Sequence, residues 1–124
     1  MNNKTVKGIL VDPYTQSLSY VDVPVEGGSS TLKGLYSAIG CSLVELISIN
    51  STTDLWIDEE GLLKVDENSR FFFIEINGRR SSALVGKGVI LGCAHTHDGI
   101  ICDNVSMTTE EASKIVLFSN FLTL

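Results

Sequence analysis

The chain has 124 residues, with 15 acidic and nine basic side chains and a formal net charge of −6 at pH 7. Nucleic-acid binding relies on clustered Lys and Arg, so a direct nucleic-acid partner is not expected. No apolar run approaches the roughly 20 residues that a membrane-spanning helix needs, and no signal segment opens the chain. We therefore expect one cytoplasmic domain over residues 1–124 that can bury its own core.

The first 40 residues predict a hairpin followed by a helix. Thr5–Val11 and Leu18–Val23 are both rich in residues that favour strands, and Asp12-Pro13-Tyr14 between them is typical of a turn. Apolar residues then recur at helical spacing between Thr31 and Gly40, where Thr31 can begin the helix and Gly40 can end it. This pattern predicts an amphipathic helix packed on a sheet.

The middle of the chain predicts three more strands. The branched residues of Leu43–Ile49 are typical of a buried, central strand. In residues 54–58, Leu and Ile alternate with polar residues and Trp, which predicts a half-buried strand. The turn Glu59-Glu60-Gly61 should then lead to a returning strand over Leu62–Val65.

The strongest strand signal lies in the second half of the chain. Phe71–Ile76 combines three Phe with two Ile, and Asn77-Gly78 after it predicts a tight hairpin turn. Phe72, Ile74 and Ile76 should share one face. Val89–Cys93 and Ile100–Asp103 predict another pair of strands.

The C-terminal segment predicts a second helix. Thr108 and Glu111 have the spacing of a capping box, and an apolar stripe continues from Ala112 toward Phe118 and Phe121. The expected fold is therefore α+β, with a mainly antiparallel sheet, hairpins and two packed helices. One core is expected from the following residues: Leu32, Leu35, Ile39, Val44, Leu46, Phe72, Ile74, Val89, Leu91, Ile115 and Val116.

Two thiols and two imidazoles lie close together in the sequence. Cys93, His95 and His97 would project from one face of a continuing strand, and Cys102 lies on the returning strand. These are ligand types that Zn²⁺ prefers, but their spacing is not a familiar zinc signature. A polar hairpin tip is the simpler interpretation, and replacing both histidines is then expected to leave the fold intact. A metal-dependent hydrolase that uses His95, His97 and Asp98 is the alternative.

Basic residues mark the candidate ligand sites. Arg79 and Arg80 follow the Asn-Gly turn, and Lys87 lies between Gly86 and Gly88. The Gly-Lys-Gly segment precedes a strand instead of opening a helix, so it is not a phosphate loop. Arg79 and Arg80 are the best local match to an anionic ligand in an acidic protein. A pocket that contains Arg79, Arg80 or Lys87 would favour a small anionic, nucleotide-like ligand.

A second set of residues is expected to contact a protein partner, because it combines consecutive carboxylates with aromatic side chains near sheet edges. Its members are Trp56, Asp58, Glu59, Glu60, Phe71 and Phe73. Few charges guard the Phe-rich strand, so pairing of open sheet edges into a homodimer is also expected.

Three segments carry a resemblance to a known family: residues 7–13 (KGILVDP), 54–63 (DLWIDEEGLL) and 86–92 (GKGVILG). Together they resemble a family of small proteins of unknown function found in phages, plasmids and other bacterial mobile elements. The resemblance implies a protein made inside a bacterial host. No catalytic constellation or cofactor fingerprint stands out, so we expect a non-enzymatic binding protein. Such a protein would inhibit a host defence system, either by covering a protein surface or by sequestering a small anionic signalling molecule.

Overall fold

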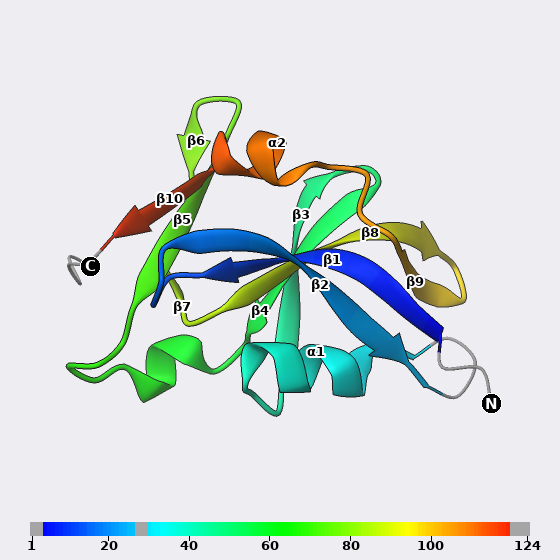
Figure 1. Ribbon diagram of the computed structural model, residues 1–124, viewed down its shortest axis with the longest axis horizontal. Coiled ribbons are helices and arrows are strands. Elements are labelled where there is room, and N and C mark those ends of the chain that lie inside the picture. Colours follow the sequence, from blue (N-terminus) through cyan, green and yellow to red (C-terminus); the bar gives the residue numbers. More distant parts are fainter. Residues whose placement is uncertain (1–3, 27–29, 120–124) are drawn as a thin grey trace.

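The computed structural model describes residues 4–26 and 30–119, and strands dominate this part of the chain (Figure 1). The strands are β1 (Lys4–Asp12), β2 (Ser17–Val25), β3 (Val44–Asn50), β4 (Thr53–Asp58), β5 (Phe71–Ile76), β6 (Arg79–Arg80), β7 (Leu84–Val85), β8 (Gly88–Thr96), β9 (Gly99–Asp103) and β10 (Val116–Ser119). The helical elements are α1 (Leu32–Ile39), the 3₁₀ turn η1 (Gly61–Lys64) and α2 (Thr109–Ser113).

The main sheet is antiparallel and has the order β2-β1-β8-β4-β3, with β9 also paired to β8. Ile90 of β8 lies between Ile9 of β1 and Leu55 of β4. The segment predicted as a central strand, Leu43–Ile49, instead forms the edge strand β3, whose apolar side chains are only half-buried. Branched residues suit a half-buried pleated surface as well as a central one, so composition alone could not place this strand.

The smaller sheet has the order β10-β5-β6, and β7 also pairs with β5. Its strand β10 corrects the prediction of two packed helices. The capping box at Thr108 and Glu111 is confirmed, but α2 spans only five residues and the chain then extends along β5. Val116 pairs with Ile74, because a branched and aromatic run fits the open edge of β5 better than another helical turn does. Phe121 lies outside the described residues.

Two apolar clusters, not one core, lie on the opposite faces of the main sheet. They are separate because successive side chains of β4 and β8 point to opposite faces. The cluster between α1 and the main sheet, called the cluster under α1 below, contains Val6, Val23, Leu35, Ile39, Trp56, Val89, Leu91 and Cys93. The cluster between the two sheets contains Ile9, Val11, Leu55, Ile57, Phe72, Ile74, Leu84, Ile90, Ala112 and Val116. In Figure 1, α1 accordingly lies below the main sheet and α2 above it, while Leu32, expected in the core, is 45% exposed.

Cover on both faces explains a second correction. Residues 54–58 were predicted to form a half-buried strand, yet β4 is buried from Thr53 to Ile57, including Asp54. The returning strand predicted over Leu62–Val65 is also wrong, because that segment winds into η1.

Local turn signals were read correctly. The β1–β2 hairpin forms around the predicted turn. Asn77 and Gly78 adopt φ values of 53° and 79°, the left-handed conformations that a tight hairpin turn needs. No helix among the described residues is long and apolar enough to cross a membrane.

Candidate functional site

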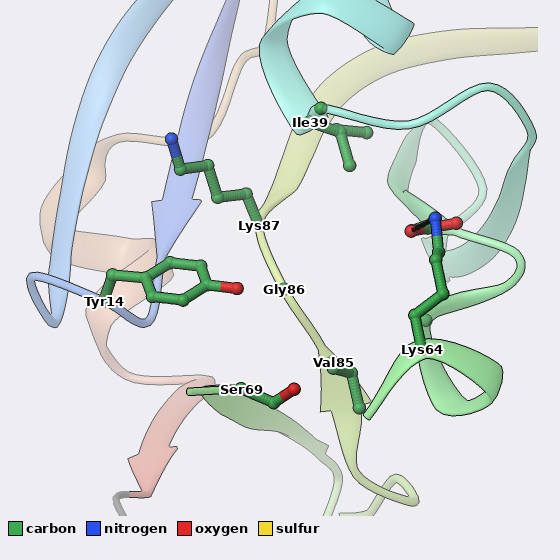
Figure 2. Close-up of a pocket in the computed structure, with 10 residues that line it drawn as sticks. Tyr14, Ile39, Lys64, Ser69, Val85, Gly86 and Lys87 are labelled. Carbon is green, nitrogen blue, oxygen red and sulfur yellow. Dashed lines mark ion pairs between the residues drawn. The ribbon is translucent and has the colours of Figure 1, made fainter. Parts of the chain in front are cut away.

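A cavity of about 350 Å³ lies where four parts of the fold meet. They are the turn after β1, the end of α1, the segment from the end of β4 through η1 to Ser69, and the segment from β7 to β8 (Figure 2). The lining residues are Tyr14, Ile39, Gly40, Asp58, Gly61, Lys64, Ser69, Val85, Gly86 and Lys87. The last two of the three segments singled out in the sequence line this cavity, and the first ends one residue before Tyr14.

Two polar side chains of the cavity are available to a ligand. Lys87 is half-buried and forms no ion pair with any residue in 4–26 or 30–119. Tyr14 lies in the turn after β1 and is 53% exposed, and its backbone N–H donates to Asp12 Oδ1 at 2.9 Å. In Figure 2 the Tyr14 hydroxyl points toward Gly86, and the Lys87 side chain lies on the same side but runs away from that hydroxyl. A cation and a hydroxyl donor therefore share one wall.

An ion pair forms the opposite wall. Lys64 Nζ lies 2.7 Å from Asp58 Oδ2, and the Asp58 side chain is only 11% exposed. Asp58 Oδ1 accepts the Glu60 N–H at 2.9 Å. One carboxylate therefore contacts both the residue before η1, Glu60, and the last residue of η1, Lys64. The hydrogen bond to Asp58 raises the pKa of Lys64. Nearby, burial and then the Asp58 charge raise the pKa of Cys41, so its thiol stays protonated.

Glycine allows the chain segments around the cavity to come close. A Cβ on Gly61 would lie 2.9 Å from the Val85 carbonyl oxygen, nearer than real side chains approach. Gly86 has a φ of 86°, which residues other than glycine rarely adopt, and its N–H donates to the Arg70 carbonyl at 2.9 Å. The glycines of these segments thus have a structural role in shaping the cavity.

The three basic residues predicted to bind an anion do not meet. Only Lys87 lines the cavity, whereas Arg79 and Arg80 lie on β6 beside a separate hollow of about 300 Å³. Arg80 is engaged within the protein, since it lies 3.5 Å from Glu75 and 5.6 Å from the centre of the Phe73 ring. Arg79 and Arg80 line the second hollow together with four apolar side chains, Ile47, Ile49, Ile74 and Ile76.

The residues predicted to contact a protein partner also divide. Trp56 is 8% exposed and Phe71 is 1% exposed, so both belong to the core and present almost no surface to a partner. Phe73 is half-buried on the same face of β5 as Phe71, and the centres of the two rings are 5.6 Å apart. The acidic turn remains accessible, with Glu59 exposed and Asp58 and Glu60 half-buried. Leu62 and Leu63 follow it and are 55% and 83% exposed.

The residues of the alternative metal site are not brought together. His95 Nε2 lies 2.7 Å from Oδ2 of the buried Asp54, while His97, at the hairpin tip, has a side chain that is 94% exposed. Cys93 and Cys102 contact each other across β8 and β9. Across residues 4–26 and 30–119, no group of three or more His, Cys, Asp or Glu side chains is arranged to hold a metal ion.

Sequence reasoning missed four of these residues. Tyr14 and Ser69 reach the cavity from separate loops and Lys64 from the end of η1, so no local pattern joins them. The Ser69 hydroxyl is used within its own loop, where it accepts the Asp66 N–H at 2.9 Å. Asp54 was assigned to the exposed face of its strand. Asp54 lies two residues before Trp56 and therefore on the same face of the strand. The large apolar Trp56 side chain was the available signal that this face is buried.

Comparison with known proteins identifies the family but no activity. No curated protein and no solved structure shows significant similarity to the chain. A family model described as Domain of unknown function (DUF3846) matches residues 6–116, which include every residue that lines the cavity. The chain therefore belongs to the DUF3846 family.

Proposed function

We propose that this protein is a non-enzymatic binding protein that holds a small anionic ligand in the Tyr14–Lys87 cavity. The observation that carries the proposal is Lys87, a half-buried cation in this cavity with no carboxylate partner among the described residues. Holding an unpaired ammonium group in a partly buried site is unfavourable unless an anion completes it. The proposal assigns no catalytic residue and no cofactor.

The size and polarity of the cavity favour a nucleotide-like ligand. A volume of about 350 Å³ lies at the lower end of the range for small-molecule sites, about 300–1,000 Å³. A phosphate group would pair with Lys87 and accept a hydrogen bond from the Tyr14 hydroxyl. The Lys64–Asp58 pair on the opposite wall offers a donor and an acceptor to the uncharged part of the ligand. Ile39 and Val85 add apolar contact.

The biological role that we propose for this binding is sequestration inside a bacterial host. The resemblance of the chain to small proteins of phages, plasmids and other mobile elements motivates this setting. A stoichiometric binder that removes an anionic signalling molecule would inhibit a host defence system without chemistry of its own. The net charge of the chain, −6, repels anions in general. Only an anion whose shape fits the cavity would reach the positive charge of Lys87.

Binding to a host protein, so that its surface is covered, is the second candidate function. The exposed Leu62 and Leu63 favour it, because neighbouring apolar side chains at 55% and 83% exposure are typical of a contact surface. Glu59 is exposed beside them and would contribute charge at the rim of such a contact.

Isothermal titration calorimetry with AMP and with inorganic phosphate tests the ligand proposal. We expect AMP to bind the wild-type protein and Lys87→Ala to weaken binding at least tenfold, because a charge-assisted hydrogen bond is worth about 1.5–3 kcal/mol. Lys33→Ala is the matched control, since it removes the same charge from an 80% exposed side chain on α1, away from the cavity. No binding of either probe, or equal affinity in Lys87→Ala, contradicts the proposal. Leu63→Asp distinguishes the second candidate function from ligand binding. This variant should abolish contact with a host protein and leave AMP binding unchanged.

A further inference from the structure

Two cysteine thiols face each other on neighbouring strands, away from the Tyr14–Lys87 cavity. Cys93 of β8 and Cys102 of β9 are directly opposite in the antiparallel register. Their sulfur atoms are 3.6 Å apart, with the Cys93 thiol donating to Cys102. Directly opposite residues of antiparallel strands have Cα atoms about 4.5–5.5 Å apart, within the range of about 4.4–6.8 Å that disulfides span. The sulfur atoms need to approach to about 2.05 Å. The pair is thus positioned to form a bond within the existing hairpin.

The two thiols differ in accessibility. Cys93 is 5% exposed and belongs to the apolar cluster under α1, whereas Cys102 is half-buried on β9. An external reagent therefore reaches Cys102 first. The hydrogen bond from Cys93 lowers the pKa of Cys102 to about 7, while the same contact and burial raise the pKa of Cys93. Cys102 has the features of an attacking thiolate and Cys93 those of the residue that completes the reaction.

An anchored histidine holds the strand beside this pair. His95 lies two residues after Cys93 on the same face of β8, and its Nε2 contacts Asp54 Oδ2 at 2.7 Å. Asp54 has no exposed surface, and its Oδ1 has no hydrogen-bond partner among the described residues. The pairing fixes β8 to β4 at the position of the thiols. It also keeps the Asp54 carboxylate near the pair, where its charge raises the pKa of Cys102 and partly offsets the lowering by the Cys93 hydrogen bond.

We propose that Cys93 and Cys102 form a thiol–disulfide exchange site whose substrate is a disulfide, either of low molecular weight or on a protein. The Cys102 thiolate attacks one sulfur of the substrate disulfide, the S–S bond breaks, and one substrate thiol leaves with a proton from water. Cys93 then gives its proton to water and its thiolate attacks Cys102 sulfur in the mixed disulfide. The bond between Cys102 and the substrate sulfur breaks, and the second substrate thiolate leaves and takes a proton from water. The protein dithiol is oxidised by two electrons, and the substrate disulfide is reduced to two thiols.

Glutathione disulfide is the probe that tests this proposal. Reduced protein is incubated with glutathione disulfide, quenched with an alkylating reagent, and analysed by intact-mass and peptide mass spectrometry. We expect the wild type to form the Cys93–Cys102 disulfide and to retain Cys41 as a free thiol, because burial and the Asp58 charge raise its pKa. Cys93→Ser should stop at a stable glutathione adduct on Cys102. Cys102→Ser should react at Cys93 at least tenfold more slowly.

Cys41→Ser is the matched control, and it should form the disulfide at the wild-type rate. Several outcomes would overturn the proposal. One is that the wild-type protein accumulates a glutathione adduct on Cys102 and does not form the Cys93–Cys102 disulfide. Another is that Cys102 of the wild-type protein reacts no faster than Cys41. The measurement on the wild-type protein needs no variant, so the proposal is tested even where a Ser substitution prevents folding. A substrate disulfide on a protein partner would then be distinguished by comparing a disulfide-bonded peptide with glutathione disulfide.

Discussion

His95 and His97 differ by two positions, but we expect their replacement to have very different effects on stability. His95 is the hydrogen-bond partner of the buried Asp54, at 2.7 Å, whereas His97 has a side chain that is 94% exposed. This asymmetry replaces the expectation from the sequence that both histidines can be removed without effect on the fold. His95→Ala leaves Asp54 Oδ2 without its partner, and Oδ1 already lacks one in the described part of the chain.

The magnitude follows from the burial of Asp54, which has no exposed surface. A buried acceptor that loses its partner costs about 1–3 kcal/mol, and an uncompensated buried charge costs about 3–5 kcal/mol. His95→Ala should therefore lower the free energy of unfolding by about 2–4 kcal/mol, a large share of the about 5–15 kcal/mol that stabilises a typical domain. His97→Ala should change it by no more than about 0.5 kcal/mol.

Urea denaturation followed by fluorescence measures both effects, because Trp56 is the sole tryptophan of the chain and lies in the buried strand β4. A double-mutant cycle with Asp54→Asn isolates the pair. In the Asp54→Asn background, His95→Ala should cost less, since no carboxylate charge is left without compensation. Equal losses in the two histidine variants, or the same loss from His95→Ala in both backgrounds, would refute the assignment of Asp54 as the reason.

Two further predictions concern β5 and α2. Phe72 is fully buried and Phe73 half-buried on the other face, so Phe72→Ala should lower the free energy of unfolding by about 3–5 kcal/mol and Phe73→Ala by less than about 2 kcal/mol. Urea denaturation checks this, and similar losses would show that the alternation of β5 is wrong. Thr108→Ala should cost about 0.5–2 kcal/mol, because its hydroxyl accepts the Glu111 N–H at 3.1 Å. The Thr108 N–H in turn lowers the pKa of Glu111, so this part of the cap stabilises the fold above the ordinary pKa of Glu and is lost as the pH falls through the lowered value. The stability difference between Glu111→Gln and wild type should therefore shrink in acid, while Glu110→Gln, the control, should show no such trend; a constant difference would count against the capping box.

The parts of the fold that local chemistry decides were predictable from the sequence. The Asn77-Gly78 turn needs left-handed backbone conformations that these residue types favour, and the Thr108 cap needs only a neighbour three residues away. The order of strands was not predictable in this way. β3 and β4 have similar apolar content, and only packing on both faces of β4 decides that β4 is central. Val116–Ser119 becomes a strand because β5 offers an edge, which the segment itself does not reveal.

The candidate site shows the same division. Lys87 was recognised because it lies between two glycines, which expose backbone N–H groups to anions. Tyr14 and Lys64 were missed because they come near Lys87 only after the main sheet forms. Arg79 and Arg80 looked equivalent in sequence, but neighbouring positions on a strand point to opposite faces. Both line the second hollow, but Arg80 also pairs with Glu75.

The position of β8 between β1 and β4 has a consequence for how the chain folds during synthesis. The β1–β2 and β3–β4 hairpins each join neighbouring segments, so they can form as soon as they leave the ribosome. Neither can pair with the other, because the strand that joins them, Gly88–Thr96, is made much later. Until then β1 and β4 each present an open edge, a state prone to aggregation. Completion of the sheet therefore depends on one late strand, and a nascent chain that stalls before it would need chaperone protection.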